Sequence, residues 1–128
     1  MSFSWREYLT LAEALIQART RFAPAEARYR TAISRAYYAA YCAARNHAAL
    51  YEGYTPITAG RDHARVAEHY RTGRTPAHHR IAHALRRLLD DRHRADYEND
   101  IIDDVRSIAR AAVQDARQVF LWLDQLTP

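Results

Sequence analysis

The chain contains little cysteine, glycine or proline, and no lysine at all. Its single cysteine, Cys42, excludes a disulfide within the chain and predicts a protein of a reducing compartment. The longest uninterrupted apolar run, from Ala36 to Ala44, is far too short to span a bilayer. The first residues do not have the layout of a signal peptide. We therefore expect a cytoplasmic protein that does not bind membranes.

The three glycines and four prolines stand only where the apolar pattern is interrupted. Between these breaks, apolar residues recur with the spacing of one helix face, and no long segment alternates with a period of two. A chain of 128 residues has the size of one domain. The pattern therefore predicts a single all-α domain over residues 1–128, an antiparallel up-and-down bundle of four to five helices.

Local signals predict where these helices begin and end. Ser4 and Glu7 have the spacing of a capping box, which places the start of the first helix at Ser4. Gly53 predicts the end of the second helix, and Thr75-Pro76 is a cap followed by a first-turn proline. Five helices are therefore predicted. The first begins at Ser4, the second runs from about Pro24 to Tyr51, and the third runs from about Arg61 to Arg71. The fourth begins at Thr75, and the fifth runs from about Asp100 to Leu123.

Basic residues are concentrated in the middle of the sequence. Residues 61–94 carry 9 arginines, 4 acidic residues and 6 of the 7 histidines, whereas residues 95–128 carry 3 arginines and 7 acidic residues. Arginine binds phosphate bidentately, so this asymmetry predicts a polyanionic ligand or an acidic partner surface. A GC-rich genome also favours alanine and arginine over lysine, and composition alone leaves that explanation open.

Two segments far apart in the sequence place arginine beside tyrosine. One runs from Ser34 to Tyr41 and contains Arg35, and the other runs from Asp91 to Tyr97 and contains Arg92. Tyr37 and Tyr41 are four residues apart and fall on the apolar stripe of the second helix, so both are expected in the core.

A buried Arg35 would require an anion, and we expect Asp96 to be its carboxylate partner. If the fold brings the two segments together between the second helix and the start of the last, two versions are open. In one, Asp96 neutralises Arg35 and the cluster is structural, and in the other the cluster is a phosphodiester site. Arg92 would then point into a cleft and hold a phosphate, with Tyr97 stacking on a base or donating a hydrogen bond. Under that hypothesis, Arg92→Ala would leave stability nearly unchanged and abolish binding.

These segments belong to a pattern that resembles HEPN domains, the helical bundles named for nucleotide binding in higher eukaryotes and prokaryotes. The resemblance covers nearly the whole chain. It implies a homodimer that binds RNA or nucleotide and works with a small nucleotidyltransferase in a toxin–antitoxin or defence-type system. Many HEPN proteins are metal-independent ribonucleases with an R-x(4–6)-H motif. The resemblance rests on Trp5…Tyr8-Leu9…Ala12, Arg35-Ala36-Tyr37-Tyr38-Ala39-Ala40, Leu88-Leu89-Asp90-Asp91-Arg92…Ala95-Asp96-Tyr97 and the long final helix.

The sequence departs from the ribonuclease motif at the histidine. Arg92 stands where the motif arginine would be, but Asp96 and Tyr97 occupy the place of the histidine. Arg86 or Arg87 with His93 has the motif spacing close to this element. The candidates are therefore Arg92, His93 and Asp96 for catalysis, and Arg35, Arg86, Arg87, Arg92 and Tyr97 for binding RNA or nucleotide.

Three functions remain open at this point. The first is a module that binds RNA or nucleotide together with a nucleotidyltransferase-type partner. The second is a metal-independent ribonuclease in which Arg92 holds the phosphate while His93 or Asp96 moves the proton. The third is a purely structural dimerisation module. None of them requires a cofactor, and the spacing of His79 and His83 on one helix face offers no third metal ligand.

Overall fold

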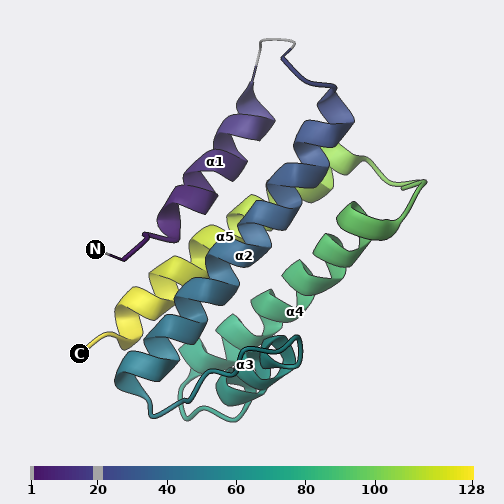
Figure 1. Ribbon diagram of the computed structural model, residues 1–128. Helices are drawn as coiled ribbons and strands as arrows, with labels where there is room; N and C mark the ends of the chain where they lie inside the picture. The colour runs from purple at the N-terminus through teal and green to yellow at the C-terminus, as the bar shows by residue number, and fades with distance from the viewer. Residues whose placement is uncertain (1, 19–21) are drawn as a thin grey trace.

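The computed structural model describes residues 2–18 and 22–128, which form five α-helices and no β-strand (Figure 1). The all-α prediction is therefore confirmed. The helices are α1 (Arg6–Gln17), α2 (Ala25–Tyr51), α3 (Asp62–Arg71), α4 (Pro76–Tyr97) and α5 (Val105–Leu126).

Four of the helices form a bundle, and the fifth is a short addition at one end. The successive long helices α1, α2, α4 and α5 run in alternating directions (Figure 1). The central helix α2 packs against α1, α4 and α5, and α5 also packs against α4 and α1. The short helix α3 packs against α4 and the end of α2. Any hollow beneath α3 is therefore bordered by α2 and α4.

Small side chains on α2 allow its neighbours to approach closely. Ala36, Ala40 and Ala44 are completely buried, and bulky residues such as Ile33 and Tyr37 fill the spaces between the layers. Tyr37 is 2% exposed and Tyr41 is 6% exposed, which confirms that both tyrosines belong to the core. Their hydroxyl groups must therefore find partners inside the protein.

Several predicted boundaries are confirmed. The second helix ends at Tyr51, and Gly53 follows with a φ of +71°. This left-handed conformation lets the amide of Tyr54 donate to the carbonyl oxygen of Ala48 at 3.1 Å, which is a common way to end a helix. At the start of α4, the hydroxyl of Thr75 accepts a hydrogen bond from the amide of His78 at 3.2 Å.

Two predicted boundaries are wrong. The first helix begins at Arg6, where Ser4 contributes its carbonyl oxygen rather than a side-chain cap. The last helix begins at Val105 rather than near Asp100, because the carboxylate of Asp104 caps it by accepting from the amide of Arg106 at 3.1 Å. The acidic stretch before Asp104 is a connection instead of a first helical turn, since helix formation starts where a side chain satisfies the free amides.

Within the described ranges, no helix is both long enough and apolar enough to cross a lipid bilayer.

Candidate functional site

The two segments that place arginine beside tyrosine do meet in the structure. Arg92 lies in the last turns of α4, not at the start of the final helix, and its Nη1 donates to the hydroxyl of Tyr38 at 2.7 Å. Its guanidinium carbon lies 5.6 Å and 5.4 Å from the ring centroids of Tyr37 and Tyr38. The Arg92 side chain is only 11% exposed, and its Nε has no hydrogen-bond partner. Arg92 is therefore packed into the wall between α2 and α4.

The predicted ion pair between Arg35 and Asp96 is not formed. Asp96 lies one helical turn after Arg92, and its Oδ2 is 3.6 Å from Arg92 Nε. Arg35 instead donates to the Ser34 hydroxyl at 3.3 Å, and that hydroxyl is 3.5 Å from Asp96 Oδ2. The spacing of four residues within one helix gave Asp96 a nearer cation than any on α2.

We expect Arg92→Ala to lower the free energy of unfolding by about 2 kcal/mol, because it removes a largely buried side chain whose guanidinium lies against two tyrosine rings. Arg92→Met should restore most of this loss, since methionine fills the same space without a buried charge. Urea unfolding of both variants, with Arg80→Ala as an exposed control on α4, measures the difference. An unchanged midpoint for Arg92→Ala would show that the guanidinium is not part of the packed wall.

His63, at the start of α3, joins this cluster although the sequence did not identify it. Its ring stacks on Tyr41 with a centroid distance of 4.1 Å and an interplanar angle of 19°. Its Nδ1 is hydrogen-bonded to the hydroxyl of Tyr37. Burial, reinforced by the nearby guanidinium of Arg92, lowers the pKa of His63 below its ordinary value. His63 is therefore neutral near pH 7, the form that can accept a proton.

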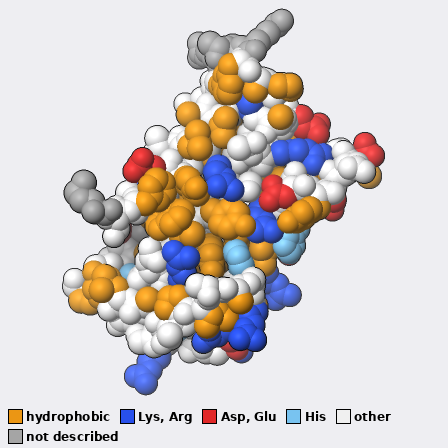
Figure 2. All heavy atoms as spheres, viewed as in Figure 1, with side chains coloured by type: hydrophobic (Ala, Val, Ile, Leu, Met, Phe, Trp, Pro, Cys, Tyr) orange, Lys and Arg blue, Asp and Glu red, His pale blue; other side chains and the backbone are white. Residues whose placement is uncertain are grey.

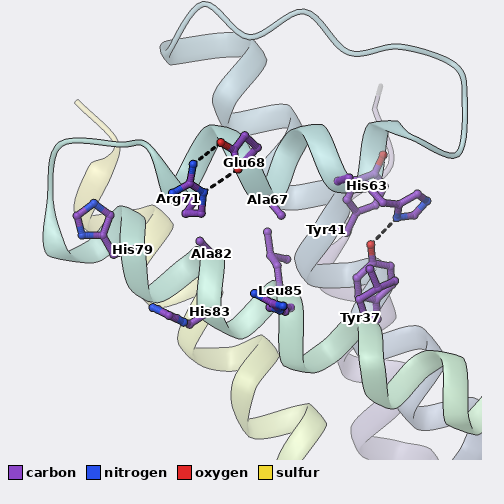
Figure 3. A pocket seen from close by; sticks show the side chains of 13 residues that line it. Tyr37, Tyr41, His63, Ala67, Glu68, Arg71, His79, Ala82, His83 and Leu85 are labelled. Atoms are coloured by element: carbon purple, nitrogen blue, oxygen red, sulfur yellow. Dashed lines mark hydrogen bonds and ion pairs between the residues drawn. The ribbon is translucent and has the colours of Figure 1, made fainter.

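A cavity of about 450 Å³ opens between α3 and α4, directly beside this histidine (Figure 3). In Figure 3, Tyr37 and His63 lie at one end of the cavity and His79 at the other, with Ala67 and Leu85 between them. Its apolar lining comes from Ala64, Ala67, Ala82, Leu85 and Leu89. Its polar lining includes the arginines Arg71 and Arg86, the histidines His63, His79 and His83, and the carboxylate of Glu68. An apolar slot with cations at its edge suits a flat ring that carries an anionic group.

The charges at the edge of this cavity are not equally available. Arg71 forms an ion pair with Glu68 at 2.5 Å, on the same helix. Arg86 is exposed and forms no ion pair within the described part of the chain, whereas Arg87 pairs with Asp115 on α5 at 3.0 Å. Of the two adjacent arginines that the sequence identified, Arg86 is therefore the one that faces the cavity with its charge unneutralised.

The remaining candidates lie away from this cavity. His93 and Tyr97 are exposed on the last turns of α4, with ring centroids 6.2 Å apart, and Tyr97 is 74% exposed. Neither of them lines the cavity, and Arg92 does not line it either. The structure thus separates the predicted residues into an accessible cation, Arg86, a partly buried cluster around Arg92 and an exposed helix end.

A second polar cluster fastens α3 and α4 to the end of α2. The carboxylate of Glu52 is 2.8 Å from His69 Nε2 and 2.9 Å from His78 Nε2, while His47 Nε2 lies 3.6 Å away. Burial alone would raise the pKa of Glu52, but the hydrogen bonds from His69 and His78 outweigh it and hold the pKa below its ordinary value. No group of three His, Cys, Asp or Glu side chains in residues 2–18 and 22–128 is arranged to hold a metal ion.

Stability should decrease as the pH falls below about 6.5, the ordinary pKa of histidine. Burial lowers the pKa of both His47 and His63. The unfolded chain then binds protons more readily than the folded one. The contribution of these two histidines to stability is therefore fully present above the pKa that they have in the unfolded chain, and it declines below that pKa. Urea midpoints measured from about pH 7.5 down to about pH 5.5 should fall, and His63→Gln should flatten the curve. The exposed His83→Gln serves as control, and an equal flattening there would contradict the assignment to His63.

Comparison with protein-family models, with curated proteins and with solved structures finds no match for this chain. The HEPN resemblance therefore rests on the quoted motifs and stays a prediction.

Proposed function

We propose that this protein binds RNA or a nucleotide in the cavity between α3 and α4. The observation that carries the proposal is the combination of an apolar slot with an unneutralised cation, Arg86, at its edge. The net charge of +4 and the concentration of arginine and histidine in residues 61–94 favour an anionic ligand. Bases stack on apolar and aromatic surfaces, and phosphates bind guanidinium groups, so one nucleotide unit satisfies both parts of the site.

The placement of the groups suggests how such a unit would lie. A base would occupy the slot between Ala67 and Leu85, beside the end of the cavity that Tyr37 and His63 form. One phosphate of this unit would then lie near Arg86, which stands on α4 six residues before Arg92. A site built on helices that the Glu52 cluster fastens together keeps these groups at fixed distances.

Arg86→Ala should weaken the binding of single-stranded RNA several-fold, and it should do so most at low salt. The wild-type protein should lose affinity steeply as salt rises, with a log–log slope of about −0.7 for each phosphate contact. Removing one contact should make that slope shallower by about that amount. Fluorescence anisotropy of labelled oligouridylate at several salt concentrations measures both quantities.

Arg110→Ala is the matched control, because Arg110 is an exposed arginine on α5 that lines a different hollow, between α1 and α5. It removes the same charge without touching the cavity between α3 and α4. Equal losses in the two variants would mean that only net charge matters. No binding by the wild-type protein at low salt would exclude the proposed function.

A metal-independent ribonuclease is the second candidate, because the fold brings a neutral histidine beside a cation. His63 and Arg92 come from different helices, and Arg92 contributes to the lowered pKa of His63 after burial. Cleavage by the ribose 2′-OH needs a group that accepts its proton, and His63 lines the cavity where the ligand would lie. In this version His63 takes the role that the sequence gave to His93 or Asp96.

The HEPN-like arrangement, the homodimer and the nucleotidyltransferase-type partner stay predictions of the resemblance. Sedimentation at micromolar concentration tests the dimer directly. A monomer of 14.8 kDa would contradict the prediction without affecting the cavity, whose described lining comes from one chain.

A further inference from the structure

A second hollow of about 450 Å³ lies on the other side of His63, between the start of α1, the middle of α2 and the connection to α3. We call it the aromatic groove. Aromatic residues and arginines both contribute to its lining. Figure 2 shows apolar side chains gathered on one face of the protein with arginines between them. Its lining is formed by Trp5, Tyr8, Arg35, Tyr38, Tyr41, Cys42, Arg45, Ile57, Ala59 and His63.

Each of the two arginines in the aromatic groove lies against two aromatic rings. The guanidinium carbon of Arg35 is 4.8 Å from the ring centroid of Tyr8 and 5.0 Å from that of Tyr38. The guanidinium carbon of Arg45 is 5.9 Å from Trp5 and 5.6 Å from Tyr41. Apart from Tyr41, which is buried, these groups are half-exposed, and together they present π faces and positive charge.

These two positive charges have no carboxylate partner. Within the described residues, the arginine ion pairs involve neither Arg35 nor Arg45. Arg35 donates to the hydroxyl of Ser34, and Arg45 donates to the amide oxygen of Asn46 at 3.1 Å. The nearby Asp62 is 1% exposed and accepts hydrogen bonds from the hydroxyls of Tyr41 and Tyr54. The aromatic groove therefore has a charge that an anionic ligand would complement.

The aromatic groove and the cavity between α3 and α4 share a wall. Tyr41 and His63 line both hollows. A ligand that filled both hollows would pass over Tyr41 and His63, the two residues that the hollows share. A single nucleotide has one base and would occupy only one of the two hollows.

We propose that the ligand is a single strand of RNA that spans both hollows, with one base in the cavity and a neighbouring base stacked in the aromatic groove. The phosphate between them passes His63 and meets Arg35 or Arg45. This inference rests on the proposed function and deepens it, because it distinguishes a strand from a mononucleotide. A duplex is excluded as the preferred ligand, since its bases are already stacked and paired and cannot reach these rings.

The test compares the binding of an oligouridylate with that of uridine monophosphate. The oligouridylate has about ten nucleotides, which is within the usual range for sites that bind single strands. The combined variant Arg35→Gln/Arg45→Gln should weaken oligouridylate binding about tenfold or more and leave monophosphate binding unchanged. Trp5→Leu should weaken oligouridylate binding in the same direction, and it retains both charges. Arg106→Gln/Arg110→Gln is the matched control, because it removes two exposed arginines from the hollow between α1 and α5.

The outcomes separate the two proposals. If oligouridylate and monophosphate bind equally and the Arg35/Arg45 variant binds like wild type, the spanning strand is wrong while nucleotide binding stands. If the control pair weakens binding as much as the Arg35/Arg45 pair, the groove contributes only general charge, and the inference is overturned. Equal competition by duplex RNA would also overturn it. If neither probe binds the wild-type protein, the proposed function itself fails. Melting temperatures of all variants show whether each remains folded.

Discussion

Asp62→Ala should lower the free energy of unfolding by about 3 kcal/mol or more, because it leaves several buried donors without an acceptor. Asp62 is 1% exposed, and its carboxylate accepts from the hydroxyls of Tyr41 and Tyr54 and from the amide of Ile57 at 3.1 Å. Burial alone would raise the pKa of Asp62, but the hydrogen bonds from Tyr41 and Tyr54 outweigh it and hold the pKa below its ordinary value. Since a typical domain is stable by about 5–15 kcal/mol, this loss is large.

The same carboxylate connects the long loop before α3 to the middle of α2. Asp62 is the first residue of α3, so its removal should also loosen the position of His63 and the wall of the cavity. Urea unfolding measures the loss of stability. Asp90→Ala, an exposed aspartate on α4, is the control and should change the unfolding midpoint little. A small effect of Asp62→Ala would mean that water replaces the lost acceptor.

Sequence reasoning was sufficient for most of the fold because helix signals are local. Gly53 and the Thr75-Pro76 pair mark boundaries through the conformations that those residues favour, and the structure has both boundaries. The sequence predicts too early a start for the last helix, because Asp100 and Asp104 are both possible caps and only the structure shows which one bonds to the amides. Tyr37 was assigned to the core correctly, since the period of the apolar stripe passes through it.

The site was harder to predict because it depends on which helix faces meet. The segments with Arg35 and Arg92 do come together. Asp96, however, forms its ion pair with Arg92, because the two residues are four positions apart on α4. His63 is missing from the sequence prediction because a single histidine at the start of a polar helix has no distinguishing spacing. The cavity itself requires α3 to lie against α4, which the Glu52 cluster arranges through contacts between distant residues. A local sequence motif does not reveal contacts between residues that are far apart in the chain.

The chemistry available to His63 is what a ribonuclease would require. If Nδ1 donates to the oxygen of Tyr37, then Nε2 is free to accept the proton of a ribose 2′-OH. The 2′-oxygen then bonds to phosphorus, the bond to the 5′-oxygen breaks, and the departing oxygen takes up a proton from water. The products are a 2′,3′-cyclic phosphate and a free 5′-hydroxyl. Burial raises the pKa of Tyr37 well above its ordinary value, so its hydroxyl stays protonated throughout.

His63→Ala should therefore reduce RNA cleavage by about 10²- to 10⁴-fold, the usual contribution of a general base. Single-turnover cleavage of labelled single-stranded RNA in the presence of a chelator measures the rate, and analysis of the ends detects the cyclic phosphate. His93→Ala is the matched control, because His93 is exposed on α4 and does not line the cavity. If His93→Ala abolishes cleavage while His63→Ala does not, the assignment from sequence is restored. If the wild-type protein binds RNA and leaves it intact, His63 serves binding alone and the ribonuclease candidate is excluded.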